Sequence, residues 1–251
     1  HIGFVLGPCI NAGGRLDTAK RSLSLLLQKD RAKADVMAAE LKTLNDERKD
    51  MTQTGAEEAI EWIEKEGRSQ DKVLVVYLPD CHESLAGIIA GRIRERYNKP
   101  VFVLTDSIDG VKGSGRSIEA YSMFEEMSKC KELYTKYGGH PMAAVLSLPK
   151  ENVEKFRTFL NEHTTLTEED FIPKITIDVP MPIGYVTEHL IEELSVLEPF
   201  GKGNEKPLFA EKNLNILSMR ILGKNRNTLK MQVRSQHGTV MDALYFGDIE
   251  Q

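Results

Sequence analysis

The stretch KVLVVYLPDCHESLAGIIAGRIRERYNKPVFVL, residues 72–104, decides the fold of the middle of the chain. Its apolar, β-branched run at 73–78 is followed by Pro79 and Asp80, as expected for a buried strand. Ser84 can cap a helix that reaches Tyr97, and a second apolar run follows at 101–104. Strand, helix and strand in this order predict a βαβ unit with a parallel pair of strands.

The pattern continues as an α/β domain over residues 67–163. We expect a strand near 111–118, a helix from Met123 to Tyr137, a strand at 143–148 and a helix at 150–162. Gly138 and Gly139 are expected to stop the helix before them. The fold class is therefore α/β, with a mostly parallel sheet in this domain.

Residues 1–66 carry helical spacing and form the connecting part of the chain. Gly7-Pro8 indicates a loop, and apolar residues then recur with helical spacing from Leu16 to Leu26. Asp30 is a good N-cap for one long connecting helix at about 31–66, which ends near Gly67. A helix of that length with one apolar stripe is typical of a brace between domains.

Residues beyond 163 indicate a second, all-β domain. A polar linker at 164–174 precedes apolar alternation from Ile175, a short helix near 187–197, and strand signals at 208–222, 228–234 and 239–246. Short strands separated by turn residues predict a small OB-fold-like β-barrel over 175–251. Its last strand signal ends close to the final residue, so we expect a truncated barrel.

Composition narrows the function classes without selecting one. The formal net charge is −5, and the acidity is local, because residues 151–199 hold 11 acidic and 3 basic groups. Three separated cysteines form no CxxC motif, which argues against a zinc site or a disulfide framework. No apolar run is long enough to cross a membrane, and no charged-then-apolar leader is present. We expect a cytoplasmic protein that does not contact membranes.

Two glycine-rich motifs are candidates for binding an oxyanion, and a third contains a histidine. GPCINAGGRL, residues 7–16, places Arg15 where a helix is expected to begin, and KGSGRS, residues 112–117, offers an arginine, hydroxyls and glycine N–H groups. YGGHPMAA, residues 137–144, holds His140 before a proline. Each motif has a structural alternative: a loop-to-helix turn, a glycine-bulged strand and a helix C-cap, respectively. His82 lacks a spaced partner ligand, so we expect an ordinary loop histidine there.

These motifs together resemble one known family. The order PCINAGGRL (8–16), CHESLAGIIAGRI (81–93), KGSGRS (112–117), YGGHPMAA (137–144) and LEPFGKGNEKPLF (197–209) strongly resembles the RecJ family of bacterial exonucleases, in the DHH phosphoesterase superfamily. The resemblance covers essentially the whole chain. It implies a connecting helix, a DHH-associated domain and most of an OB-fold domain. The family's catalytic DHH domain would precede residue 1.

The resemblance also implies an activity and a set of residues. It implies 5′-to-3′ hydrolysis of single-stranded DNA with Mn²⁺ or Mg²⁺ in recombination and repair, with the metal ligands and catalytic residues outside this chain. Single-stranded DNA is the expected partner, and a single-strand-binding protein or a helicase is a further candidate. The residues expected to bind the 5′-phosphate and the first nucleotides are Asn11, Arg15, Ser114, Arg116, Ser117, Gly139 and His140.

Two other functions are compatible with the sequence. One is a different DHH phosphodiesterase that acts on short oligonucleotides or cyclic dinucleotides, although the all-β extension after residue 175 argues against it. The other is a non-catalytic module that binds nucleic acid or a protein. A metal-dependent nuclease assay on the chain by itself distinguishes an enzyme from such a module.

Overall fold

The computed structural model describes residues 2–201, 203–223, 226–247 and 249. Residues 2–173 and 174–249 within these ranges form two compact units, and each is described by itself. Lys202 of the 197–209 motif lies outside the described residues. None of the described helices is both long enough and apolar enough to cross a membrane.

The first unit begins with three helices and a short π-helical turn, Ile2–Leu6 (η1). The helices are α1 (Gly7–Leu16), α2 (Ala19–Leu27) and α3 (Arg31–Lys65). Residues 7–15 therefore belong to a helix, and the predicted loop at Gly7-Pro8 is wrong because proline is tolerated in the first turn of a helix. The long helix is confirmed, and the Asp30 side chain caps it by accepting a hydrogen bond from the Lys33 N–H at 3.2 Å.

A five-stranded mixed sheet follows, in the order β1–β2–β3–β5–β4. Its strands are β1 (Leu74–Tyr77), β2 (Val101–Ser107), β3 (Gly110–Arg116), β4 (Lys136–His140) and β5 (Ala143–Leu148). The predicted βαβ unit is confirmed, with β1 parallel to β2 and α4 (Glu83–Tyr97) between them. The other described helices of this unit are η2 (Arg68–Gln70), α5 (Met123–Ser128), η3 (Lys131–Leu133), η4 (Lys150–Asn152), α6 (Val153–His163) and η5 (Glu168–Phe171).

The prediction of a mostly parallel sheet is wrong. Strands β2, β3, β5 and β4 pair in antiparallel fashion, because two-residue loops join β2 to β3 and β4 to β5. A parallel connection needs a crossover of a dozen or more residues. The predicted helix from Met123 to Tyr137 is also wrong after Ser128, where the chain turns and forms β4.

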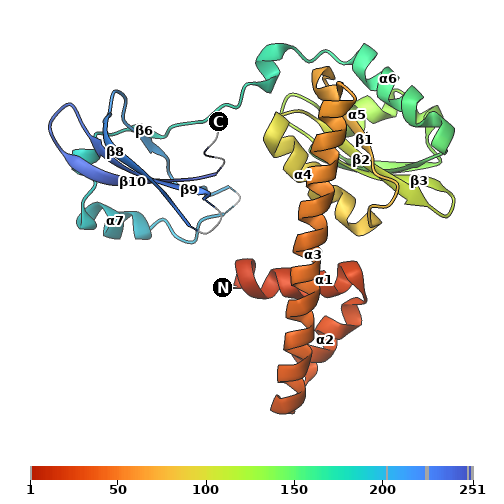
Figure 1. The fold of residues 1–251 in the computed structure, drawn as a ribbon, viewed down its shortest axis with the longest axis horizontal. Helices are drawn as coiled ribbons and strands as arrows, with labels where there is room; N and C mark the ends of the chain where they lie inside the picture. The colour runs from red at the N-terminus through yellow and green to blue at the C-terminus, as the bar shows by residue number, and fades with distance from the viewer. Residues whose placement is uncertain (1, 202, 224–225, 248, 250–251) are drawn as a thin grey trace. The chain divides into compact units, whose positions relative to one another are not determined.

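Helices cover both faces of this sheet (Figure 1). On one face, α3 and α4 bury Leu74 and Val76 of β1 and Val101 and Val103 of β2. The two helices approach closely at Gly55, where an added Cβ would lie 2.7 Å from the Ile89 Cδ1 atom. The opposite face packs on α5 and α6 through residues that include Phe102, Met123, Met127, Phe156 and Leu160.

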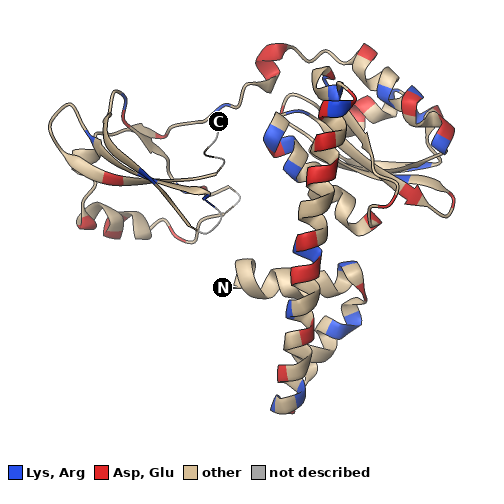
Figure 2. Cartoon of the chain, viewed as in Figure 1, with Lys and Arg blue, Asp and Glu red and all other residues tan. Residues whose placement is uncertain are grey.

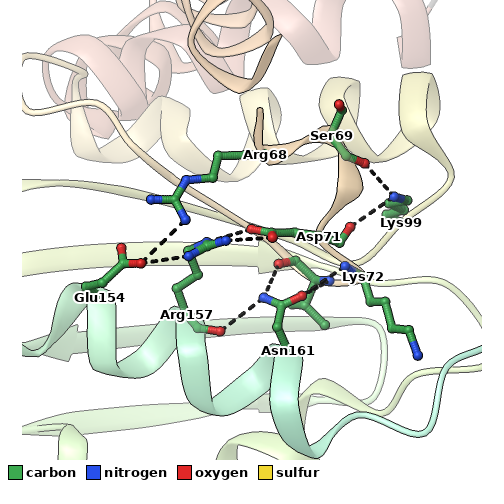
Figure 3. Close-up of polar contacts among 9 residues, drawn as sticks. Arg68, Ser69, Asp71, Lys72, Lys99, Glu154, Arg157 and Asn161 are labelled. Atoms are coloured by element: carbon green, nitrogen blue, oxygen red, sulfur yellow. Dashed lines mark hydrogen bonds and ion pairs between the residues drawn. The ribbon is translucent and has the colours of Figure 1, made fainter. Parts of the chain in front are cut away.

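A polar clasp joins the beginning of β1 to α6 (Figure 3). Both Asp71 carboxylate oxygens accept hydrogen bonds at 2.6 Å from Arg157, and this pair is largely buried. The Asn161 Oδ1 atom accepts from the backbone N–H groups of Lys72 and Val73 at 2.9 and 3.0 Å. Its Nδ2 atom donates to the Val73 carbonyl at 2.9 Å. The Asn161 side chain thus forms hydrogen bonds with backbone groups just before β1, where no neighbouring strand that the structure describes pairs with them.

The second unit contains two small sheets. Strands β6 (Val179–Pro180) and β7 (Phe209–Ala210) are parallel, and β8 (Asn215–Leu222), β9 (Thr228–Arg234) and β10 (Val240–Phe246) form an antiparallel sheet. A 3-10 turn, η6 (Ile183–Tyr185), and an acidic helix, α7 (Glu188–Ser195), lie between β6 and β7 in the chain (Figure 2). Within the described residues these strands do not close into the predicted barrel.

Candidate phosphate-binding site

The first turn of α4 brings two arginines from distant segments together. Arg15 lies in the last turn of α1, and its Nη1 donates to the Ser84 carbonyl at 2.7 Å. The Ser84 hydroxyl donates back to the Arg15 carbonyl at 3.0 Å. These two bonds fasten the end of α1 to α4, so Arg15 stands at the end of a helix and not at the predicted beginning of one.

Arg116 reaches the same turn from the end of β3. Its guanidinium lies against Gly87, where an added Cβ would be 2.8 Å from Nη2, and its Nη1 donates to the Gly115 carbonyl at 2.7 Å. Burial lowers the pKa of the half-buried Arg116 guanidinium, and the positive charge of Arg15 lowers it further. Arginine still remains protonated at neutral pH. The two cations therefore repel each other.

Neither arginine forms an ion pair with a carboxylate in the part of the chain that the structure describes. Two neighbouring guanidinium groups without a counter-charge are stabilised when an anion binds between them. Bidentate donors of this kind match the oxygens of a phosphate. The arrangement is therefore a candidate anion-binding site.

Strand register places Ser114 and His140 on the same face of the sheet as Arg116. Arg116 is opposite Ala143 of β5, and Ala143 is opposite His140 of β4, so the three share one row across the sheet. Ser114 lies two residues before Arg116, in the next row on that face. The His140 Nδ1 atom accepts a hydrogen bond from the Met142 N–H at 3.2 Å. The neutral ring then carries its proton on Nε2, which is a donor for an anion.

The glycines of KGSGRS serve the core and not the ligand. Gly113 and Gly115 point away from the arginine face, where an added Cβ at Gly115 would lie 2.7 Å from the Met123 sulfur. The register of β3 with both neighbours is regular, so the expected alternative of a glycine bulge is wrong. Gly139 has φ +154°, and an added Cβ there would lie 2.4 Å from the Ala143 carbonyl oxygen. That glycine is required by the tight β4–β5 hairpin.

The two remaining predicted site residues, Ser117 and Asn11, have different surroundings. The Ser117 hydroxyl is buried and donates to the Tyr121 carbonyl at 2.5 Å, so it stabilises the turn after β3. Asn11 is exposed one helical turn before Arg15, and both line a shallow groove between α1 and α2.

Sequence reasoning missed two residues of α4, Ser84 and Gly87, that position the arginines. The pattern of this helix suggests only a small residue for helix packing at Gly87, whereas this glycine makes room for the Arg116 guanidinium. The expected helix cap is Ser84, but His82 occupies that position and accepts the Ser84 N–H at 3.3 Å. The spacing of Ser84 and Gly87 by three residues, on one face of the first helical turn, is the available signal.

The described residues offer no resident metal site. No group of three or more His, Cys, Asp or Glu side chains in this part of the chain could hold a metal ion. The acidic and histidine residues present therefore do not fit the two-metal centre that the resemblance implies.

Comparisons with known proteins agree with this architecture. The DHHA1 domain family matches residues 70–165, and the RecJ OB domain family matches residues 177–251. The "single-stranded-DNA-specific exonuclease RecJ" of Bacillus subtilis is 38% identical over 94% of this chain. That of Escherichia coli is 35% identical over 98% of this chain. The chain spans 30% and 44% of the lengths of these two relatives.

Solved structures give the same result. The crystal structures of RecJ from Thermus thermophilus in complex with Mg²⁺ and with Mn²⁺ superpose with TM-scores of 0.81 and 0.83, at 28% identity. Each covers 99% of this chain, which corresponds to 38% and 36% of those chains. The chain is thus homologous, over nearly its full length, to the C-terminal DHHA1 and OB region of the RecJ exonucleases.

Proposed function

We propose that this chain supplies the wall of a RecJ-type exonuclease cleft that binds the 5′ end of single-stranded DNA. The observation that carries the proposal is the pair Arg15 and Arg116, held side by side on the first turn of α4 without a carboxylate partner among the described residues. Metal-dependent hydrolysis, with Mn²⁺ or Mg²⁺, is assigned to a part of the protein outside this chain.

A terminal phosphate fits these donors better than an internal one does. A phosphate monoester carries about −1.5 to −2 charges at neutral pH, because its second pKa is about 6. An internal phosphodiester carries a single charge. In the proposed complex the two guanidinium groups, the Ser114 hydroxyl and the His140 Nε2–H contact the terminal phosphate oxygens. Recognition of the 5′ end in this way would set a 5′-to-3′ polarity.

We assign a different role in DNA binding to each part of the chain. We assign the substrate-end site to residues 67–163 together with Arg15, residues 1–66 to the brace and residues 175–251 to contacts further along the strand. On the β8–β10 sheet we assign the exposed Arg220 to the DNA backbone; Lys230, which is opposite it in the register, forms an ion pair with Asp242 at 2.6 Å that DNA would have to displace. Protein partners, such as a single-strand-binding protein or a helicase, and a cytoplasmic location remain part of this proposal.

A binding experiment tests the proposal. A 3′-labelled oligothymidine with a 5′-phosphate should bind this chain more tightly than the same oligomer with a 5′-hydroxyl, as measured by fluorescence anisotropy. Charge-assisted hydrogen bonds contribute about 1.5–3 kcal/mol each, so Arg116→Ala or Arg15→Ala should remove most of the preference. Equal affinity for the two oligomers in the unsubstituted chain would contradict the proposal.

A further inference from the structure

A second row of cations lies on the same face of the sheet as Arg116. Lys112 of β3 and Lys136 of β4 are both opposite Ser147 of β5, so all three side chains share a row and a face. Two residues along a strand span about 7 Å, and this row is therefore about 7 Å from the Ser114 row. The lysine row and the Arg116 row lie on either side of Ser114.

The lysine row borders an open pocket of about 450 Å³. Its polar lining comes from Ser84, Thr105, Lys112, Ser114, Lys136, Tyr137 and Ser147, and from one carboxylate, Glu83. Arg15, Arg116 and His140 do not line it, so the pocket is adjacent to the arginine site and separate from it. Pockets that bind small ligands have volumes of about 300–1,000 Å³, and a nucleotide is within the capacity of this one.

The charge of the pocket favours an anion. Glu83, the only carboxylate among its lining residues, lies 2.8 Å from the Lys112 Nζ atom, and both side chains are about half exposed. Lys136 is exposed and forms no ion pair with any residue that the structure describes. One lysine charge is thus uncompensated, and the hydroxyls of Ser114 and Ser147 add donors for phosphate oxygens, whereas the Ser84 hydroxyl already donates to the Arg15 carbonyl.

We propose that this pocket is a second phosphate subsite, which binds a phosphoryl group covalently linked to the one held at Arg15 and Arg116. The inference rests on the proposed function for the first site only. Ser114 borders both subsites, and a nucleotide chain passing over it would present successive anionic groups to the arginine row and to the lysine row. Glu83 tunes the affinity, because it competes with the ligand for Lys112.

Two kinds of nucleotide carry the required second phosphoryl group. One is an oligonucleotide, in which the group is the internal phosphodiester next to the 5′ end. The other is a 5′-diphosphate end, in which the group is the β-phosphate. Thymidine 5′-monophosphate, the dinucleotide pdTpdT and thymidine 5′-diphosphate therefore form a matched series of probes.

The experiment compares these probes on the whole chain by calorimetry. We expect Lys112→Gln combined with Lys136→Gln to weaken pdTpdT or the diphosphate by at least about tenfold, with little change for the monophosphate. The dependence of log affinity on log salt should also become shallower, because the variant no longer holds lysine charges that salt can screen. Glu83→Gln should strengthen binding of the same ligand by severalfold. Lys155→Gln on α6, which packs on the opposite face of the sheet, is the matched control.

Each outcome has a defined meaning. Weakening of pdTpdT alone identifies an internal phosphate, and weakening of the diphosphate alone identifies a polyphosphate end; both support the subsite. Unchanged affinity of the lysine variant for both ligands overturns it. Loss of binding in Arg116→Ala with no effect of the lysine substitutions leaves the proposed function intact. If the lysine substitutions weaken binding and Arg116→Ala does not, the proposed function is contradicted, and the anion site at the lysines is still supported.

Discussion

At the scale of single residues, the absence of a side chain at position 87 positions a cation. The Arg116 guanidinium occupies the space that a Cβ at residue 87 would fill. Glycine inside a helix costs about 0.5–1 kcal/mol relative to alanine. Glycine at position 87 therefore lowers the stability of the helix but leaves room for the Arg116 guanidinium.

Gly87→Ala should separate these two effects. The added methyl group would displace the Arg116 guanidinium, so we expect a severalfold loss of affinity for a 5′-phosphorylated oligomer. The free energy of unfolding should stay constant or rise by up to about 1 kcal/mol. Gly91→Ala, one turn later, has open space around the new Cβ and is the matched control. It should gain stability and keep its affinity, and equal behaviour of the two variants would contradict the steric argument.

The Cys81 thiol should be slow to react. Burial raises its pKa to about 11, from 9.0 in the unperturbed group. A pKa raised this far leaves about one hundredth of the thiolate that an unperturbed cysteine has at pH 8. The folded form holds its proton more tightly, so any stability linked to this group is present below pH 9 and decreases as pH rises toward 11.

Iodoacetamide labelling followed by mass spectrometry measures this directly. At pH 8 we expect peptides containing Cys81 to be modified about a hundredfold more slowly in the folded chain than in urea. Cys81→Ser identifies the peptide signal. Equal rates in the two conditions would show that the thiol is ionised normally.

At the scale of elements, one face of β3 packs in the core and the other carries polar and charged side chains. Its odd-numbered residues, Gly113 and Gly115, admit Leu104, Phe102 and Met123 of the core. Its even-numbered residues, Lys112, Ser114 and Arg116, face the two proposed subsites. One short strand therefore combines tight packing with donors for phosphates, as the two-residue period of a strand allows.

Gly115→Ala should destabilise the first unit by about 1–3 kcal/mol, because overpacking a filled core forces neighbouring side chains to move. Urea denaturation followed by circular dichroism gives this value. Gly138→Ala in β4 has no atom within 4 Å of the new Cβ and should change stability far less. Similar losses of stability for both variants would mean that strand propensity, and not packing, explains these glycines.

Local patterns predict the elements better than their pairing. Asp30 and the apolar stripe after it identify the long helix to within a residue or two, and residues 72–104 identify the βαβ unit. The antiparallel pairing of β3, β5 and β4 escapes the sequence pattern, because the apolar spacing in 123–137 is typical of one continuous helix. Without β4, the hairpin at Pro141 and Met142 that forces antiparallel pairing is not visible.

The candidate site is only partly predictable for the same reason. The motifs indicate Arg15, Arg116 and His140, but the approach of the two arginines depends on α4, which contacts them through Ser84 and Gly87. The contacts of Arg15 with Ser84 and of Arg116 with Gly87 leave no periodic signal in the sequence. The two core-facing glycines of KGSGRS show a second limit of sequence patterns. A glycine pattern that is typical of an anion-binding loop is also typical of closely packed strands.

At the scale of the whole molecule, the two units are joined by a short exposed segment. Residues 166–171 pack on the first unit, where Leu166 is buried and the Asn98 side chain donates to the Phe171 carbonyl at 2.8 Å. The exposed residues follow from Ile172 onward. The exposed linker therefore begins later in the chain than the linker expected at 164–174.

Limited trypsin digestion should cut this connection after Lys174, because that residue is exposed and lies outside regular structure. We expect two resistant fragments, residues 1–174 and 175–251, resolved by mass spectrometry. Early cleavage at Lys155 or Arg157 instead would show that α6 opens more readily than the connection.

The chain alone should not release mononucleotides from 5′-labelled single strands in the presence of Mn²⁺. The physical reason is that no cluster of metal-ligating side chains occurs among the described residues. Thin-layer chromatography of the products checks this expectation. Release that copurifies with the chain, and is abolished in Arg116→Ala, would contradict it.

The clasp at Asp71, Arg157 and Asn161 has a mechanical consequence. Asp71 and Lys72 lie just before β1, Arg157 and Asn161 lie in α6, and hydrogen bonds connect these two segments directly. A tensile force applied to the flanking segments would therefore pass through the clasp. The clasp would share this load with the packing of α3 on the sheet, so it would reduce the tension on the strands that bear the proposed phosphate-binding residues.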